Sequence, residues 1–336
     1  MRDFLTRRWF ILGLLTLIPL GFVLGASLLE TEPGALEEKV GTLSKLLTPI
    51  VLFLMSVTLD SGKLWAAVRA PGPVLWACVV NFGVIPLCAW PLVAWQLHPD
   101  FAVGLMVAAS VPCTMAAASV WTRKAQGNDA VSMLVTILTN GLCFLVTPLW
   151  LHWGIGATVQ IDLWEMVKKL LLSALLPILM GQLVRQWSLL RDLADRLKTQ
   201  LGVMAQSCIL AIVFWAAMQG GPRLRTANVD QGFLQAALLV WGCVIALHAM
   251  GLVVAWYGGR MWGFDRSDRV ATTFAGSQKT LPIGIYIATD LLQGVPFAVY
   301  PMVMFHASQL VLDTFVVDLM QRPSHDGQRE SDPSVR

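Results

Sequence analysis

The sequence predicts an all-α polytopic membrane protein, and two observations carry that prediction. Of its 336 residues, 56% are hydrophobic and only 13% are charged. Apolar runs of about 18–25 residues recur from end to end, and each is long enough to cross a hydrocarbon layer of about 30 Å. The first run follows a basic segment, as a signal peptide would, but it is longer than a signal-peptide core and is interpreted as a helix.

Ten hydrophobic spans are expected along the chain. Basic residues are distributed unevenly between their connections, and one side holds 17 of the 24 Lys and Arg residues. Cytoplasmic connections carry such an excess, so both termini are predicted to be cytoplasmic in a plasma (inner) membrane protein. A cytoplasmic N-terminus (residues 1–8) and a disordered cytoplasmic tail (321–336) are expected to flank a ten-helix membrane domain at 9–320. The spans are expected at 9–29, 44–60, 73–96, 101–122, 129–153, 163–187, 201–219, 232–257, 270–292 and 296–320.

Ten spans divide into two repeats of five, at about residues 9–153 and 163–320. An odd number of spans inverts the second repeat relative to the first, an arrangement common among transporters. The fourth span contains Pro112 among small residues, and the ninth reads FAGSQKTLPIG. Because Pro removes a backbone donor and frees a carbonyl one turn back, helices four and nine are predicted to be discontinuous. If they cross near the membrane centre, free carbonyls and hydroxyls meet there, as a small-cation site requires.

Several other classes of protein are disfavoured. All six cysteines lie in apolar runs without CxxC spacing, which argues against disulfides and a zinc site. No basic–aromatic patch suggests nucleic-acid binding. An intramembrane enzyme would need a nucleophile–base pair or a metal motif such as HExxH, and the sequence offers neither. No cofactor is expected, apart from the option of bound Na⁺.

Three segments carry a resemblance to a known family: VLFLMSVTLDSGKLWAAVRAPGPV, VVNFGVIPLCAW and KAQGNDAVSMLVT, which begin at residues 51, 79 and 124. The chain resembles the bile acid–sodium symporter family, including its divergent symporter-like branch, from about Ser44 to Met320. The Gly-Asn turn of the third segment, followed by Ser and Thr four residues apart, is the most specific match. The resemblance implies a core domain (spans three to five and eight to ten) that rocks against a panel domain (spans one, two, six and seven).

The resemblance also implies cation-binding residues, because the family binds two sodium ions behind the crossing of helices four and nine. Ser132 and Thr136 lie four residues apart on one helix face, so both hydroxyls can point at one ion. Asn81 matches an amide of the third span and Gln278 a glutamine of the ninth. Ser119, near the break in the fourth span, is the remaining candidate.

Lys279 is the main departure from the family pattern. Bacterial sodium symporters of the family carry a glutamate shortly before the glutamine, where this chain has the uncharged segment Phe274–Ser277. A lysine about 6 Å from a sodium ion would repel it by about 3 kcal/mol at an effective dielectric of 20, so two bound sodium ions are not expected. Either one site survives, or the ammonium occupies the place of a cation. Such a lysine could also attract an anionic substrate or load and release a proton.

The alternative for Lys279 is snorkelling to the cytoplasmic interface. From its position in the span, this needs about 13 Å of reach at 1.5 Å per residue, and a lysine stem supplies about half of that. A functional lysine inside the membrane is therefore favoured.

Thr114, His306 and Asp313 complete the candidates related to substrate or coupling. His306, Gln309 and Asp313 share one face of the tenth span, which also fits an interhelical hydrogen-bond network. Asp313 is a candidate counter-charge for Lys279. His248, in the eighth span, is expected to be structural.

The favoured function is a secondary active transporter of a small organic anion, coupled to sodium or protons. The runner-up is a proton-coupled exporter of small anions. A membrane sensor that uses the same fold without transport stays open, because function depends on the site rather than the fold. The substrate, the direction of transport and the oligomeric state do not follow from the sequence.

Overall fold

The computed structural model describes residues 2–28, 35–59, 71–115, 117–156, 159, 161–226, 231–292 and 294–321. Within these ranges the chain is helical, and no strand occurs. The predictions for the basic connection around Lys63 and Arg69 and for the tail beyond Gln321 lie outside the described residues. The helices, in chain order, are α1 (Arg2–Leu28), α2 (Ala35–Val57), α4 (Pro71–Val79), η2 (Val80–Val84), α5 (Ile85–Val93), α6 (Pro99–Ser110), α7 (Ala117–Lys124), α8 (Asp129–Ile155), α9 (Leu163–Leu170), η3 (Leu171–Leu175), α10 (Leu176–Val184), α11 (Ser188–Arg196), α12 (Lys198–Thr226), α13 (Gln231–Met261), α14 (Arg266–Ser277), α15 (Leu281–Tyr286), η4 (Ile287–Leu291), η5 (Pro296–Ala298) and α16 (Val299–Gln321).

Six helical segments of the described chain are long and apolar enough to cross a membrane, as a polytopic membrane protein requires. Shorter apolar helices at Leu12–Ser27, Leu46–Val57 and Pro99–Ser110 coincide with three of the other expected spans. The count of ten spans and their division into inverted repeats stay predictions. The six segments are Pro71–Val93, Asp129–Ile155, Leu163–Val184, Lys198–Gln219, Gln231–Met261 and Pro296–Gln321.

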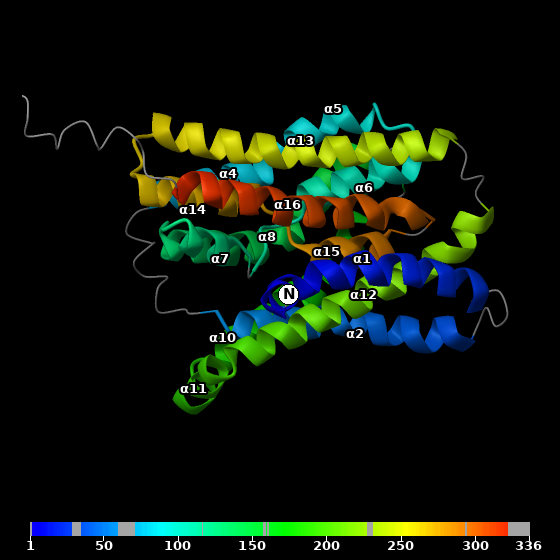
Figure 1. The fold of residues 1–336 in the computed structure, drawn as a ribbon, viewed down its shortest axis with the longest axis horizontal. Helices are drawn as coiled ribbons and strands as arrows, with labels where there is room; N and C mark the ends of the chain where they lie inside the picture. Colours follow the sequence, from blue (N-terminus) through cyan, green and yellow to red (C-terminus); the bar gives the residue numbers. More distant parts are fainter. Residues whose placement is uncertain are drawn as a thin grey trace, which may run out of the picture.

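The helices form two groups (Figure 1). One group contains α1, α2, α10 and α12, and the other contains α4 to α8, α13, α14 and α16. Helices α1 and α12 approach each other closely, because a Cβ at Gly25 would lie 2.0 Å from the Met218 carbonyl oxygen. Ser56 of α2 donates to the Ile178 carbonyl of α10 at 2.7 Å. Helix α11 extends away from both groups (Figure 1).

Two helices of the second group are interrupted where the sequence places proline. α6 ends at Ser110, and Val111 is extended (φ −67°, ψ 156°) because Pro112 disfavours a helical conformation in the residue before it. α14 ends at Ser277, Gln278 is extended (φ −77°, ψ 149°), and α15 begins at Leu281 with a proline in its first turn. The Thr280 N–H donates to the Pro112 carbonyl at 2.9 Å, so the two breaks meet.

The Gly-Asn turn fixes the far ends of these interrupted helices. Asn128 caps α8 by accepting from the Ala130 N–H at 3.1 Å. Its Nδ2 donates to Asp268 Oδ1 at 2.7 Å, on the first turn of α14. Asp265 caps α14 by accepting from the Asp268 N–H at 2.8 Å. The turn between α7 and α8 is therefore tied to the start of α14.

Candidate functional site

Lys279 lies in the break between α14 and α15, and its side chain is fully buried. Its Nζ donates to the Asn81 carbonyl at 2.6 Å, to Asn81 Oδ1 at 3.3 Å and to the Val111 carbonyl at 3.0 Å. We call Asn81, Val111 and Lys279 the lysine cage. Three acceptors match the three protons of an ammonium group, and no carboxylate of the described residues forms an ion pair with it. The side chain does not reach an interface, so snorkelling does not describe this structure.

The carbonyls of the lysine cage are free for a local reason in each helix. Val111 stands in the extended segment after α6, beyond the helical ladder. Asn81 belongs to the π-helix η2, in which the Ile85 N–H donates to the Val80 carbonyl, five residues back. The fifth residue after Asn81 is Pro86, which has no N–H to donate. Both oxygens therefore need a donor from outside their own helix, and the ammonium supplies it.

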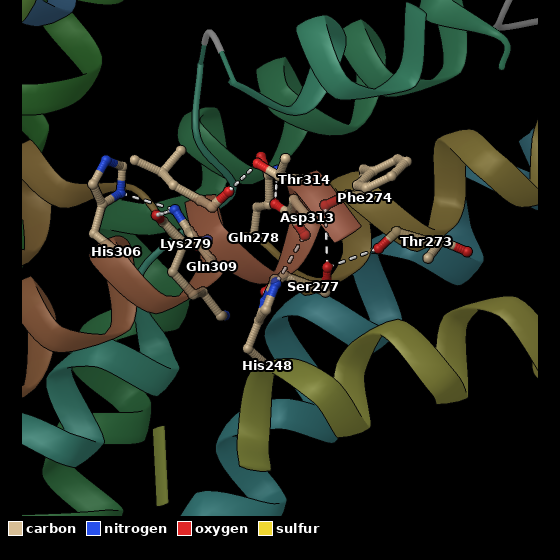
Figure 2. A network of polar contacts seen from close by, with 11 residues as sticks. His248, Thr273, Phe274, Ser277, Gln278, Lys279, His306, Gln309, Asp313 and Thr314 are labelled. Carbon is tan, nitrogen blue, oxygen red and sulfur yellow. Dashed lines mark hydrogen bonds and ion pairs between the residues drawn. The ribbon is translucent and has the colours of Figure 1, made fainter. Parts of the chain in front are cut away.

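Two amide side chains hold the break in place. Asn81 Nδ2 donates to the Gln278 carbonyl at 2.9 Å and to the Gly276 carbonyl at 3.2 Å. Gln309 of α16 accepts from the Lys279 N–H at 2.9 Å through Oε1 and donates to the Lys279 carbonyl at 3.0 Å through Nε2. Gln309 Nε2 also lies 2.8 Å from His306 Nδ1 (Figure 2).

A buried histidine–carboxylate pair lies on the other side of the break (Figure 2). His248 Nε2 is 2.9 Å from Asp313 Oδ1, and Gln278 Nε2 donates to Asp313 Oδ2. His248 Nδ1 lies 3.2 Å from the Ser277 carbonyl, which can only accept, so this nitrogen carries a proton. The remaining contact then needs either an imidazolium with a carboxylate or a neutral imidazole with a protonated acid. In both forms the pair has zero net charge and holds one proton between its two members.

Six hydroxyl side chains lie on α7 and α8, and we call four of them the α7–α8 hydroxyls: Ser119, Thr122, Ser132 and Thr136. These helices pack with α14 through small residues such as Ala118 and Ala275. The hydroxyl oxygens of Ser119, Thr122 and Ser132 are buried and have no hydrogen-bond partner among the described residues. Thr136 Oγ1 donates to the Ser132 carbonyl at 2.9 Å.

The structure brings some of the sequence-predicted residues together and separates others. Asn81 contacts Lys279, but the amide oxygen expected to bind a cation faces the ammonium instead. Thr136 Oγ1 lies 3.4 Å from the Thr114 carbonyl, across the break in the fourth predicted span. His306 reaches Lys279 through Gln309. The carboxylate of Asp313, considered as a counter-charge for Lys279, is instead bound by two other side chains.

The SBF-like CPA transporter family matches residues 8–322. The chain belongs to this family. Its membership accounts for the resemblance to bile acid–sodium symporters noted in the sequence, and an integral membrane protein is what the apolar helices require.

Individual relatives are distant but cover most of the chain. "Sodium/bile acid cotransporter 7" of Xenopus tropicalis is 22% identical, over 93% of this chain and 91% of the relative. "Probable sodium/metabolite cotransporter BASS4, chloroplastic" of Oryza sativa subsp. japonica is 26% identical, over 90% of this chain and 74% of the relative. An uncharacterized protein of Pseudomonas aeruginosa is 27% identical over 71% of each chain.

The partners of two residues were not predicted from the sequence. His248, expected to be structural, pairs with Asp313, and Gln309 pairs both backbone groups of Lys279. A lone histidine in an apolar span gives a weak signal, because its partner stands on a helix that is 65 residues away in sequence. For Gln309 the sequence indicates only that it shares a helix face with His306 and Asp313.

Proposed function

We propose that the protein is a secondary active transporter of a small organic anion, with its coupling site where the two breaks meet. The observation that carries this proposal is the buried ammonium of Lys279, held by carbonyl and amide oxygens. A charge inside a membrane protein is costly, and such residues mark substrate and ion pathways. Membership of a transporter family supports the same function.

The coupling cation in this proposal is a single sodium ion. Ser119, Ser132 and Gln278 each present a buried oxygen without a partner among the described residues, and Na⁺ requires oxygen ligands. Thr136 donates its proton to a carbonyl, which leaves its lone pairs available to the ion. The ammonium of Lys279 takes the place of a second ion, since Asn81 already directs its oxygen to it. The names of the vertebrate and plant relatives support sodium coupling.

The transport mechanism in this proposal is alternating access. Two inverted repeats, 9–153 and 163–320, form a core domain that holds the breaks and a panel domain that moves against it. The separation of α1, α2, α10 and α12 from the other helices supports this division (Figure 1). Both termini face the cytoplasm, and the membrane is the plasma (inner) membrane.

The substrate in this proposal is drawn to the positive charge of Lys279. No carboxylate of the described residues pairs with that charge, so the potential near the break favours an anion. Thr114 and His306 are the proposed substrate contacts, and Asp313 belongs to the coupling network behind them.

The second candidate is a proton-coupled exporter of small anions. The buried pair of His248 and Asp313 favours it, because this pair holds one proton within the membrane region. Sodium would then be dispensable, and the α7–α8 hydroxyls would bind water.

The test is the thermal stability and anion uptake of purified protein, with sodium compared against potassium. We expect sodium to stabilise the wild type and to drive uptake into proteoliposomes. Lys279→Ala should bind sodium more tightly, by about a hundredfold for a repulsion of about 3 kcal/mol, and should reduce anion uptake more than tenfold. The matched control is Lys169→Ala, because Lys169 pairs with Glu165 on the surface of α9 and should affect neither measurement.

Each alternative has its own signature in these measurements. Sodium indifference of the wild type, with a sodium response only in Lys279→Ala, would favour proton coupling. Absence of anion uptake and binding under every condition would contradict transport and favour a sensor.

A further inference from the structure

The contact between Gln309 and His306 has a fixed direction. The Lys279 N–H can only donate, so the atom of Gln309 that it meets must be the carbonyl Oε1. The other end of the amide is then the NH₂ group, which donates to the Lys279 carbonyl at 3.0 Å. Its second hydrogen points to His306 Nδ1 at 2.8 Å. His306 Nδ1 must therefore accept, and its ring proton sits on Nε2.

A proton on His306 Nδ1 is incompatible with this arrangement. Two N–H donors would face each other across 2.8 Å. Rotating the Gln309 amide by half a turn would give His306 an acceptor. The same rotation would turn the NH₂ group toward the Lys279 N–H and Oε1 toward the Lys279 carbonyl, so both backbone contacts would be lost. Gln309 keeps all three of these contacts only while His306 Nδ1 is unprotonated.

Of the three hydrogen-bonded residues Lys279, Gln309 and His306, the last is the most exposed. Lys279 and Gln309 are fully buried, whereas His306 is 7% exposed. The His306 ring meets the edge of Phe10 from α1, with ring centroids 6.0 Å apart. α1 belongs to the helix group that does not contain the breaks (Figure 1). His306 thus stands where the two groups of helices meet, on the route from that boundary to the break.

The other titratable groups around α16 are already engaged. The proton of the His248–Asp313 pair is shared between two partners, and Lys279 directs its ammonium to the lysine cage. His306 Nδ1, by contrast, carries a lone pair that only an amide N–H occupies. The charged and titratable groups on the elements packed against α16 include His248 and Tyr257 of α13, Asp100 of α6, Lys279 of the break, Tyr286 of α15, Arg266 of α14, and Arg123 and Lys124 of α7. The described side chains of α1 include no charged or titratable group, and Phe10 is the one that contacts His306.

We propose that His306 Nδ1 is a proton-binding site that controls the transport site, with Gln309 as the positioning residue between them. A proton from solvent adds to the Nδ1 lone pair, the Gln309 N–H loses its acceptor, and the Lys279 backbone is released from α16. The effect of this release on transport rests on the proposed function, because the released segment carries the ammonium that attracts the anion. The hydrogen-bond switch itself does not require transport.

The experiment measures amide hydrogen exchange in the peptide that contains Lys279, as the pH is lowered from about 8 to about 4.5 and corrected for intrinsic rates. In the wild type, protection of the Lys279 amide should fall as the pH decreases toward the midpoint of a one-proton switch, by up to about tenfold per pH unit, and should level off below it. In His306→Asn, an amide oxygen takes the position of Nδ1 and cannot be protonated. Protection should then be independent of pH.

His98→Asn is the matched control. His98 Nδ1 also accepts a hydrogen bond, from the Asp100 N–H at 3.2 Å, at the start of α6. The same chemical change there should leave the pH dependence of the Lys279 peptide as in the wild type.

Gln309→Glu tests the coupling from the opposite direction. A carboxylate can accept from protonated His306 and from the Lys279 N–H at once, so it favours the protonated ring. Because the Lys279 N–H keeps its acceptor when the ring is protonated, protection of the Lys279 amide should no longer fall as the pH is lowered. A purely structural role for Gln309 would lower protection at every pH and leave its pH dependence as in the wild type.

The outcomes separate this inference from the proposed function. A wild-type pH dependence in His306→Asn or in Gln309→Glu would overturn the switch and leave transport untouched. A switch that behaves as expected in a protein that transports no anion would refute the proposed function alone.

Discussion

The two sides of the candidate site differ in how fully their polar atoms are paired within the protein. In the lysine cage, each free oxygen accepts from the ammonium, and Gln309 pairs both backbone groups of Lys279. Among the α7–α8 hydroxyls, three buried oxygens have no partner within the described chain. A region whose cation is covalently attached can be fully satisfied at all times. A region whose ligand must arrive and leave has to tolerate unpaired oxygens in between.

The largest effect is expected at Asp313, whose two oxygens pair with His248 and Gln278 beside the lysine cage. Asp313→Leu removes the acceptor of Gln278 and leaves His248 buried without its partner. We expect the free energy of unfolding to fall by about 3–5 kcal/mol, the cost of removing one member of a buried pair. Thermal or denaturant unfolding in detergent measures the change.

Asp313→Asn is the control for this prediction. The amide oxygen still accepts from Gln278, and the amide NH₂ can donate to a neutral His248, so the loss should stay below about 1.5 kcal/mol. Equal losses in the two variants would mean that charge, rather than hydrogen-bond direction, holds the pair together.

The comparison is sharpened by removing two hydroxyls of α8 in turn, one that has hydrogen-bond partners and one that has none among the described residues. Thr139 Oγ1 accepts from the Cys113 N–H at 3.3 Å and donates to the Val135 carbonyl at 2.8 Å. Thr139→Val therefore leaves a buried N–H unpaired and should cost about 1–3 kcal/mol. Ser132 Oγ has no such partner, so Ser132→Ala should change stability in potassium by less than about 0.5 kcal/mol.

Sodium separates the two variants further. Ser132→Ala should lose the stabilisation by sodium that the wild type shows, whereas Thr139→Val should keep it. A Ser132→Ala protein that is clearly unstable in potassium would mean that its hydroxyl has a structural partner, and the contrast between the two sides would disappear.

The smallest effect is expected outside both regions, in the last turn of α11. Arg185 makes two contacts with Asp195, at 2.8 and 3.2 Å, and its hydrogen bond lowers the pKa of that carboxyl group. Asp195 is half exposed, so Asp195→Asn should cost less than about 1 kcal/mol at neutral pH. Because the folded pKa is depressed, this contribution is present above the unfolded pKa of about 4 and is lost as the pH falls through the folded value.

Unfolding as a function of pH checks this prediction, with Asp192→Asn as the control. Asp192 is more exposed and lies 3.6 Å from Arg191, so its removal should change nothing measurable. A difference between Asp195→Asn and the wild type that persists at the lowest pH would point to a cause other than the ion pair.

The breaks in the helices could be predicted from the sequence, because proline acts on its own neighbours. Pro112 dictates the conformation of Val111 whatever surrounds it. The polar network could be predicted only in outline. His306, Gln309 and Asp313 share a face by their spacing, but their partners depend on which helix packs against that face.

The missed features are those that depend on long-range packing. The pairing of His248 with Asp313, and of Gln309 with the Lys279 backbone, joins segments that are 65 and 30 residues apart. The π-helix at Val80–Val84 was also not predicted, because its extra residue leaves no mark in the hydrophobic pattern of a span that is apolar on most faces.

That π-helix has a consequence for how the protein could change over time. While the π-helix persists, the Asn81 carbonyl faces a proline five residues ahead, so its own helix supplies no donor. If Lys279 were replaced by a smaller neutral residue, this oxygen would still require a donor or a cation from elsewhere, and water or a free ion is the nearest substitute. The requirement for a donor or a cation is therefore a property of the π-helix that contains Asn81, and the lysine is one of several ways in which a descendant of this chain could meet it.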